Sequence, residues 1–332
     1  MNSFKVSNFL IGGSARTFII AEIGINHGGN FTKCLKMIKL AAKAGADAVK
    51  IQTVDADESY KNKTKSYKEF KRKNFSDNQI KEIIKLAKKL KIIFFSTPGD
   101  VTSLKRLINL KIPIIKISSG LSNNYPLIRE VIRCKIPLII STGFSEKKNL
   151  IELKNFLKKF KFNKISILKC ISKYPLPLDK IDMNNILQYK KIFNYPIGYS
   201  DHSIGLLAPI IAVSKGAQII EKHFTMNNKL KGADHKISLE PDQFKKMVNN
   251  IRNTEKILGS NKLNLIKELK KNKKKFQRVL VAKRNINYGE KFSIENIKFV
   301  RIPNNKGKEP KYFFKIENRK SRRKIYKDQF IK

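Results

Sequence analysis

The sequence has no tryptophan, only three cysteines and four histidines, and far fewer acidic than basic residues. Cys34, Cys134 and Cys170 form neither an even set nor a metal-ligand spacing, which argues against a disulfide framework and a structural zinc site. We therefore expect a soluble protein of the reducing cytoplasm. No run of about 18 apolar residues occurs, so no membrane span is predicted. The first residues lack a basic region before an unbroken apolar core, so no signal peptide is predicted.

The shortage of acidic residues leaves 26 Asp and Glu against 71 Lys and Arg in 332 residues, a formal net charge of +45. So large a charge raises the question of nucleic-acid binding. Lysines, however, are spread along the chain at spacings that fit solvent-facing helix surfaces, and they would also attract small anionic substrates. RNA binding through the basic C-terminal part stays open as a less favoured hypothesis, which predicts an affinity that falls steeply with salt.

Short apolar runs alternate with amphipathic segments between residues 18 and 258. The runs are nearly continuous and rich in β-branched residues, which is typical of parallel strands covered by helices. Eight strand–helix repeats predict a closed (β/α)₈ TIM barrel rather than an open sheet. The expected strands are FIIAEIGI, AVKIQT, IIFFSTP, IIKISSG, LIISTG, ISILKC, IGYSDH and QIIEKHFT, and the expected helices cover residues 32–44, 78–90, 100–110, 126–134, 147–160, 183–189, 206–215 and 242–258.

The composition changes after this barrel domain, which we place at residues 1–258. Residues 259–275 are charged and poor in large apolar side chains, which predicts a linker. Residues 276–332 resume short strand patterns, with a turn at 287–289, and predict a small second domain. The alternating pattern of KIYKDQFIK favours a last strand of that domain over an RNA-binding arm.

Polar residues gather at the carboxyl ends of the predicted strands, where (β/α)₈ barrels form their active sites. One such residue is usually a solvated rim residue, but seven polar ends around one mouth predict a polar ligand site. All four histidines follow or end barrel strands. The polar ends are Asn26-His27, Gln52-Thr53, Ser96-Thr97, Ser118-Ser119, Ser141-Thr142, Ser200-Asp201-His202 and Glu221-Lys222-His223, and His235 follows the last of them.

His202 and His223 end neighbouring strands, where two imidazoles could hold a divalent metal with positions open for ligands. Such a set suits Mn²⁺, with Mg²⁺ or Co²⁺ as alternatives, better than structural zinc, which takes four firm ligands. A structural role is more common for any single histidine, but the joint placement favours the metal. Ser200, Asp201 and His202 are not a nucleophilic triad by themselves, because neighbouring side chains in a strand point apart.

Lys50 and Lys116 lie within apolar strand runs, and an unpaired buried lysine is costly. One interpretation pairs them with strand carboxylates such as Glu22 or Glu221. The other makes them a cationic cradle for phosphate and carboxylate groups, and it is favoured because neither lysine has a carboxylate in its own strand. Further hydroxyl donors to this cradle would be Ser119, Ser141 and Ser200.

AEIGINHGG, AGADAVKIQT, FFSTP, KISSG, IISTG, KCISKYPLP, GYSDHSIG, IEKHFT and GADHKISLEP occur in this order at strand ends. Together they resemble the sialic acid synthase family, which includes the N-acetylneuraminate, legionaminate and pseudaminate synthases, over nearly the whole chain. RVLVAKRNINYGEKFSIENI is similar to the antifreeze-like (SAF) domain that ends these enzymes. The resemblance implies a transferase that condenses phosphoenolpyruvate with an open-chain N-acyl hexosamine and releases phosphate by C–O cleavage.

The resemblance also assigns roles to the residues that match. His202 and His223 would hold the metal, which would polarise the sugar aldehyde. Glu22 would be a further catalytic residue, and Arg301 would reach the N-acyl group from the SAF domain of the partner in a domain-exchanged homodimer. Phosphoenolpyruvate would be held by Lys50, Lys116, Ser119, Ser141 and Ser200, and the sugar by Gln52, Thr97, Tyr174 and Asp234.

Three features depart from the family pattern. Leu121 stands where the family has glutamate, which raises the alternative of a catalytically impaired barrel that still binds sugar and phosphate. Gly99 stands where phenylalanine is common and predicts a looser pocket wall. The segment after the second strand is short and very basic, which predicts a different lid.

The motifs do not separate the possible products. GADHKISLEP resembles the neuraminate and legionaminate branches, whereas SDHSIGLLAPIIAV resembles the pseudaminate branch. The leading hypothesis is N-acetylneuraminate synthase acting on N-acetylmannosamine. The alternatives are legionaminate or pseudaminate synthases, which act on a diacetamido hexose.

Overall fold

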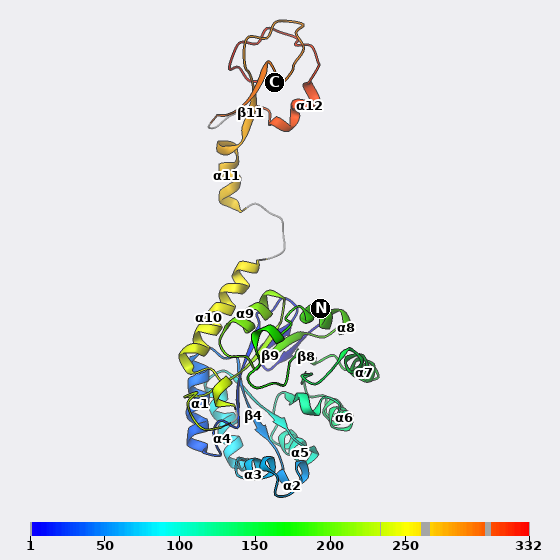
Figure 1. Cartoon of the computed structure of the whole chain (residues 1–332), viewed down its shortest axis with the longest axis vertical. Helices are drawn as coiled ribbons and strands as arrows, with labels where there is room; N and C mark the ends of the chain where they lie inside the picture. The colour runs from blue at the N-terminus through cyan, green and yellow to red at the C-terminus, as the bar shows by residue number, and fades with distance from the viewer. Residues whose placement is uncertain (1, 233, 260–265, 303–306, 332) are drawn as a thin grey trace. The chain divides into compact units, whose positions relative to one another are not determined.

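The computed structural model describes residues 2–232, 234–259, 266–302 and 307–331 (Figure 1). The chain forms two compact units, Met1–Gly259 and Ser260–Lys332. Among the described residues, no helix is long and apolar enough to cross a membrane.

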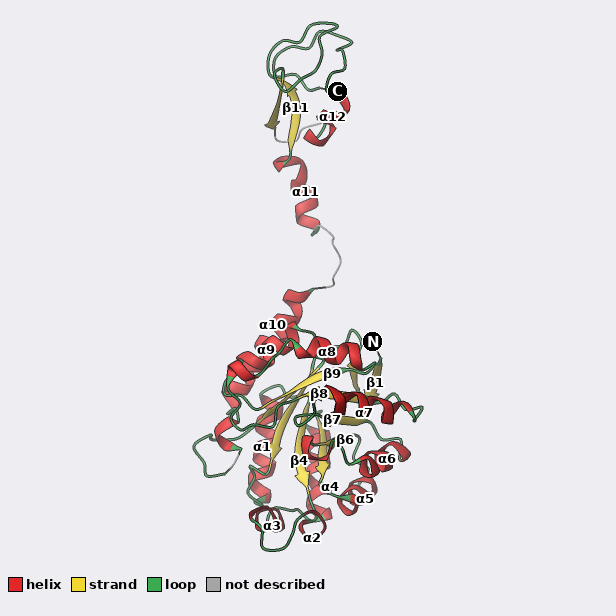
Figure 2. Ribbon diagram, turned by 45° about the vertical axis from the view of Figure 1, so that its right-hand side comes forward, coloured by secondary structure: helices red, strands yellow, loops and turns green. Residues whose placement is uncertain are grey.

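Eight parallel strands close into a barrel in the first unit (Figure 2). Each strand pairs with its neighbour in sequence, and the last strand closes the ring against the first. The predicted TIM barrel is therefore confirmed, strand by strand. The strands are β3 (Phe18–Gly24), β4 (Ala48–Thr53), β5 (Ile93–Pro98), β6 (Ile115–Ile117), β7 (Leu138–Ser141), β8 (Ile165–Lys169), β9 (Ile197–Asp201) and β10 (Ile219–His223).

Amphipathic helices cover the outside of the barrel (Figure 2). In α4, for example, Ile80, Ile83 and Ala87 are buried at helical spacing, and a capping box of Ser76 and Gln79 satisfies the first turn. These helices lie within a few residues of the predicted ranges. They are α1 (Phe31–Lys43), α4 (Asp77–Lys89), α5 (Val101–Asn109), α6 (Tyr125–Arg133), α7 (Lys147–Lys158), α8 (Asn185–Ile192), α9 (Leu207–Ser214) and α10 (Pro241–Leu258).

An N-terminal hairpin, β1 (Ser3–Val6) and β2 (Phe9–Gly12), precedes the barrel and was not predicted. The basic segment after β4 forms two short helices, α2 (Ala56–Ser59) and α3 (Lys65–Lys71). The expectation of a loose wall at Gly99 is wrong. A Cβ built on Gly99 would lie 2.7 Å from Val54 Cγ1 and 3.0 Å from Ser59 Oγ, so the space beside Gly99 is already filled.

The second unit contains α11 (Lys267–Phe276), α12 (Phe313–Ile316) and the antiparallel strands β11 (Arg278–Ala282) and β12 (Ile297–Arg301). The predicted linker is thus partly helical, and its residues 260–265 lie outside the described residues. The predicted last strand is wrong for the described residues 324–331, which make only isolated bridges, Ile286 with Ile325 and Val281 with Phe330. The small core of this unit comprises Leu280, Ala282, Ile286, Ile297, Phe313, Ile325 and Ile331.

A buried ion pair shows how the strands separate inner from outer side chains. Lys222 and Asp201 are both fully buried, and their Nζ and Oδ2 atoms lie 2.5 Å apart. Lys222 does not line the cavity described below, although its neighbours Glu221 and His223 both do. The alternation of side chains along β10 therefore directs Lys222 to the helix layer, and Glu221 and His223 to the barrel interior.

His27 is fully buried just after β3. The Gly29 N–H donates to its Nδ1 at 3.0 Å, and its ring centroid lies 4.5 Å from that of Phe75. Burial, helped by the positive charges of Lys73 and Lys33, lowers the pKa of His27 to about 4. This histidine is therefore neutral and structural.

We predict that His27 makes the protein less stable in acid. The unfolded chain takes up the proton near pH 6.5 and the folded chain only near pH 4. The free energy of unfolding therefore falls by up to about 3 kcal/mol across this window as the pH is lowered. Urea titrations at several pH values between 7 and 4.5 give the free energy of unfolding as a function of pH. This free energy should change less steeply with pH in His27→Asn than in the wild type. The asparagine amide oxygen can still accept from Gly29. An unchanged slope would contradict this assignment.

Candidate active site

A cavity of about 220 Å³ opens at the carboxyl ends of the barrel strands. Every barrel residue predicted for the site lines it: Glu22, Lys50, Gln52, Thr97, Lys116, Ser119, Ser141, Tyr174, Ser200, His202, His223 and Asp234. Two further lining residues, Ser118 and Glu221, were named only as polar strand ends, and Glu221 also as a lysine partner. The sequence gave no site role to the other four, which are Gly120, Phe144, Cys170 and Ser172. The polarity of the strand ends thus located the cavity correctly.

Alternation along the strands explains why these residues meet. Lys50 and Gln52 are two positions apart in β4, and Glu221 and His223 are two positions apart in β10. Side chains at such positions point to the same face of a strand, which here is the barrel interior. Ser200 and His202, at the end of β9, follow the same rule.

Four buried charges form the floor of the cavity. Lys50 Nζ lies 2.6 Å from Glu22 Oε2 and 3.8 Å from Glu221 Oε2, and Lys116 Nζ lies 3.4 Å from Glu221 Oε1. The carboxylates come from other strands, and Glu22 stands opposite Lys50 in the register of β3 and β4. The absence of an acid in each lysine's own strand was therefore a poor reason to set pairing aside. The pairing with strand carboxylates is confirmed, and the paired lysines also line the cavity, so the cradle for phosphate and carboxylate groups stays a prediction.

The two glutamates differ in how easily they take up a proton. Burial raises the pKa of Glu221, but the ammonium groups of Lys116 and Lys50 outweigh it and hold the pKa at about 2. Burial dominates at Glu22 and raises its pKa despite Lys50. Burial also lowers the pKa of Lys116, which Glu221 offsets only in part. Glu22 is therefore the carboxyl of this cluster best suited to carry a proton.

Hydroxyl groups surround the charges. Lys50 donates to Thr97 Oγ1 at 3.0 Å, Ser200 donates to Glu221 Oε1 at 2.8 Å, and the Gly143 N–H donates to Ser119 Oγ at 2.9 Å. Ser141 Oγ is buried and has no hydrogen-bond partner among the described residues. Such a hydroxyl, in a cavity that two lysines also line, is free to bind a ligand oxygen.

His202 and His223 face each other across one side of the cavity, with ring centroids 5.5 Å apart. His202 Nδ1 lies 2.8 Å from the Ile171 carbonyl oxygen, which can only accept, so this nitrogen donates. Burial lowers the pKa of His202, but its contacts with Cys170 and with the Ile171 carbonyl outweigh burial and raise it. His223 Nδ1 is buried without a partner among the described residues. Burial, reinforced by His202, lowers the pKa of His223 well below its usual value, so the ring is neutral.

Two imidazoles that face each other in one cavity fit a divalent metal that keeps open positions, and such a metal would displace any proton from the nitrogens it binds. Asp234 adds a carboxylate nearby, since its Oδ2 lies 3.8 Å from His223 Nδ1. The described residues include no group of three or more His, Cys, Asp or Glu side chains that could hold a metal ion by themselves. The set therefore fits a metal completed by substrate or water, and it does not fit structural zinc.

Tyr174 covers the two histidines from the loop after β8. Its ring centroid lies 4.0 Å from that of His202. Two residues later, Leu176 donates its N–H to the His202 carbonyl at 2.9 Å. The Tyr174 side chain remains about half exposed, at 48%. It can therefore contact both the metal-binding side of the cavity and a ligand that enters from solvent.

Arg301 and Leu121, which the sequence analysis singled out, do not line this cavity. Arg301 belongs to β12 of the second unit, where its Nε donates to the Lys275 carbonyl at 2.8 Å and its guanidinium stacks 4.3 Å from the Phe276 ring centroid. Leu121 ends the short helix η1 (Ser119–Leu121), packs against the hydrophobic core and does not line the cavity. The structure thus places the family's missing glutamate position beside the cavity rather than in its wall.

Known proteins resemble this chain over its whole length. Residues 37–263 match the NeuB family and residues 277–332 match the SAF domain. The chain is 39% identical over its full length to an uncharacterized protein of Methanocaldococcus jannaschii, 98% of which is covered. It is 36% identical to the pseudaminic acid synthase of Campylobacter jejuni, over 93% of this chain and 94% of that protein.

A solved structure shares the fold of this chain. The N-acetylneuraminic acid synthetase of Leptospira borgpetersenii, crystallised with citrate, superimposes with a TM-score of 0.78 at 34% identity. The match covers 81% of this chain and 94% of that one. Family match, sequence identity and barrel architecture coincide over most of the chain. The protein is therefore a member of the NeuB family, a barrel of phosphoenolpyruvate-using sugar acid synthases followed here by a SAF domain.

Proposed function

We propose that this chain is an N-acetylneuraminate synthase, which condenses phosphoenolpyruvate, N-acetylmannosamine and water to N-acetylneuraminate and phosphate. The observation that carries the proposal is one cavity with two buried lysines on its floor and two facing histidines on its wall. The lysines suit an anion and the histidines suit a metal that binds a neutral sugar. Legionaminate or pseudaminate synthesis from a diacetamido hexose is the alternative within the family, since relatives with named products make different acids.

The lysines and hydroxyls would fix phosphoenolpyruvate. Lys50 and Lys116 carry the charge for its phosphate and carboxylate groups, and the unpartnered hydroxyl of Ser141 would donate to one of them. Ser119 and Ser200 supply further hydroxyls on the same side. Holding the anion in this way would place its C3 toward the open side of the cavity, where the sugar aldehyde must arrive.

The reaction then needs two bonds to form and one to break. C3 of phosphoenolpyruvate bonds to the aldehyde carbon, a water oxygen adds to C2, and the bond between C2 and the phosphate oxygen breaks. The two protons of that water end on the former aldehyde oxygen and on the departing phosphate. Glu22, whose pKa burial raises, is placed to hold and release one of them.

Family members use a divalent metal, and for this chain we propose Mn²⁺ on His202 and His223. When bound, the ion would polarise the aldehyde and lower the barrier to attack. The same cavity is lined by Gln52, Thr97, Tyr174 and Asp234, which would orient the sugar hydroxyls. We also propose a homodimer in which Arg301 of one protomer reaches the N-acyl group in its partner.

The central prediction concerns phosphate release. Phosphate should appear only when phosphoenolpyruvate, an N-acyl hexosamine and Mn²⁺ are all present, because each occupies a separate part of the cavity. His202→Ala and His223→Ala should lower kcat by on the order of 100-fold or more, through loss of the metal. A malachite green assay with N-acetylmannosamine and the diacetamido hexoses, followed by chiral product analysis, measures this.

His27→Asn is the matched control, because this histidine also follows a barrel strand but does not line the cavity. It should keep nearly full activity at neutral pH. Absence of turnover with every sugar in the panel would refute the proposed function. Equal losses in all three histidine variants would show that the effect is on folding.

A second candidate, the catalytically impaired barrel, rests on Leu121. We expect Leu121→Glu to change kcat by less than about threefold, because the side chain packs beside the cavity and not in its wall. Leu121→Gln controls for the change in shape and polarity without charge. A gain of about tenfold or more that only the glutamate variant shows would establish that the wild-type chain is impaired.

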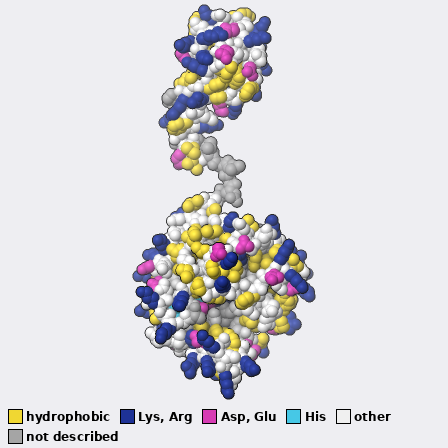
Figure 3. Space-filling model, in the orientation of Figure 1, with side chains coloured by type: hydrophobic (Ala, Val, Ile, Leu, Met, Phe, Trp, Pro, Cys, Tyr) yellow, Lys and Arg dark blue, Asp and Glu magenta, His cyan; other side chains and the backbone are white. Residues whose placement is uncertain are grey.

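RNA binding finds less support. Lys and Arg side chains are dispersed over the visible face of each unit rather than gathered in one stripe (Figure 3). A nucleic-acid site would need a concentrated basic surface.

A further inference from the structure

An exposed aromatic ring lines the active-site cavity, and the proposed reaction leaves it without a role. Phe144 lies in the loop after β7 and lines the cavity, although its side chain is 70% exposed. Single exposed apolar residues are common on protein surfaces and need no explanation. Phe144 differs from these because it stands at the edge of a cavity whose lining is otherwise mostly polar.

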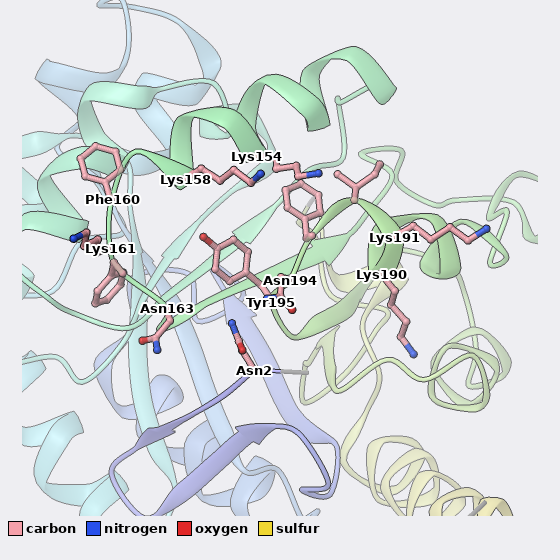
Figure 4. A pocket seen from close by; sticks show the side chains of 13 residues that line it. Asn2, Lys154, Lys158, Phe160, Lys161, Asn163, Lys190, Lys191, Asn194 and Tyr195 are labelled. Atoms are coloured by element: carbon pink, nitrogen blue, oxygen red, sulfur yellow. The ribbon is translucent and has the colours of Figure 1, made fainter.

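A second hollow, of about 850 Å³, shows the contrast. It lies beside the C-terminal ends of α7 and α8. Lys161, Lys190 and Lys191 point away from one another there (Figure 4), and the helix dipole alone favours lysines near helix C-termini. Phe160, an aromatic residue of this hollow, packs against the barrel core. Phe144 is not among the described residues that pack against that core, so packing does not explain its position.

The backbone beside Phe144 is fixed against the cavity wall. The Gly143 N–H donates to Ser119 Oγ at 2.9 Å, and the Ser172 N–H donates to the Gly143 carbonyl at 3.3 Å. A Cβ built on Gly143 would overlap Ser172 Oγ and would lie 2.7 Å from Ser119 Oγ and 3.0 Å from Cys170 Sγ. The loop approaches the wall this closely because residue 143 has no side chain. Phe144 is therefore held at the edge of the cavity by its own backbone.

Phe144 stands over the part of the cavity proposed for phosphoenolpyruvate. Ser119, to which its loop is bonded, and Ser141, which ends the same strand, are two of the hydroxyls proposed for that anion. β7 lies opposite β3 in the ring of eight strands, so Phe144 is on the side of the barrel away from Glu22. The sugar aldehyde must arrive beside the histidines at the ends of β9 and β10. The ring is therefore closer to the anion than to the aldehyde.

We propose that Phe144 is an apolar cap on bound phosphoenolpyruvate, which positions its C3 methylene and keeps bulk water from the charges beneath. This inference rests on the proposed function only for the use of phosphoenolpyruvate, and it holds for any acceptor sugar. The methylene carries neither charge nor hydrogen-bonding group, so it suits an apolar ring. The ring covers one face of this planar group and leaves the other open to the aldehyde. Excluding bulk water also strengthens the attraction of the lysines for the anion, because the effective dielectric constant falls.

The exposed surface of Phe144 is large enough for a measurable effect on binding. A phenylalanine side chain has roughly 150 Å² of surface or more, so an exposure of 70% leaves about 100 Å² in water. At ~25 cal/mol per Å², covering about 55 Å² of apolar surface changes a dissociation constant about tenfold. Contact with about half of the exposed ring is therefore sufficient.

The test measures phosphoenolpyruvate binding in the wild type, Phe144→Ala, Phe144→Leu and Leu178→Ala. Leu178 is the matched control, because it is 57% exposed and follows β8 but does not line the cavity. Calorimetry with Mn²⁺ and without sugar gives the Kd for phosphoenolpyruvate. We expect this Kd to rise about tenfold in Phe144→Ala, less than about threefold in Phe144→Leu and less than about twofold in Leu178→Ala. In turnover, Phe144→Ala should raise the KM for phosphoenolpyruvate and change kcat by less than about threefold.

The outcomes separate this inference from the proposed function. A Kd for phosphoenolpyruvate that stays within about twofold of the wild type in Phe144→Ala would overturn the inference, and so would an equal rise in Leu178→Ala. A higher KM for the sugar alone would assign the ring to the acceptor instead. A changed elution volume of Phe144→Ala in size-exclusion chromatography would assign it to contact between copies of the chain.

The proposed function can fail while the inference stands. If no sugar is consumed by any of the four proteins, the proposed function is refuted, and the titrations with phosphoenolpyruvate still decide whether Phe144 is a cap. Absence of phosphoenolpyruvate binding by the wild type would refute both.

Discussion

The buried contact of two lysines with two glutamates is the constraint on which the site depends. Lys50, Lys116, Glu22 and Glu221 lie inside the barrel, where any one of them alone would be costly. They come from four strands, β3, β4, β6 and β10, so their mutual neutralisation requires the closed barrel in its observed register. A slip of one residue in any of these strands would turn its charge toward the apolar helix layer.

The sequence predicted the barrel and its mouth because both follow from local patterns. Nearly continuous apolar runs identified the strands, and the polar residues that end them, such as His202 and His223, must share one opening once the barrel closes. Glu221 was considered only as a partner for the lysines. It pairs with Lys116 across the barrel interior, and a contact between strands so far apart in sequence leaves no local signal.

Tertiary packing accounts for the predictions that failed. KIYKDQFIK alternates like a strand, but only Ile325 and Phe330 find single bridging partners in a unit whose core is a handful of residues. The prediction of a looser pocket wall at Gly99 assumed that the missing side chain leaves empty space. Val54 and Ser59 occupy that space. The helix of Lys267–Phe276 is rich in lysine and nearly free of large apolar residues, so its pattern resembled a linker.

Charge balance connects the cavity to the basic surface of the chain. The two lysines and two glutamates on the cavity floor cancel, so the floor by itself does not favour the trianion phosphoenolpyruvate. Extra positive charge must come from a metal ion on the two imidazoles, from a proton on Glu22, or from the surrounding field. The raised pKa of Glu22 lowers the cost of that proton. Further positive charge lines a hollow on the segment after β4, where Lys63, Lys65, Lys68 and Arg72 form no ion pair with any described residue. The positive charge at the opening of the cavity would therefore assist the entry of anionic substrates.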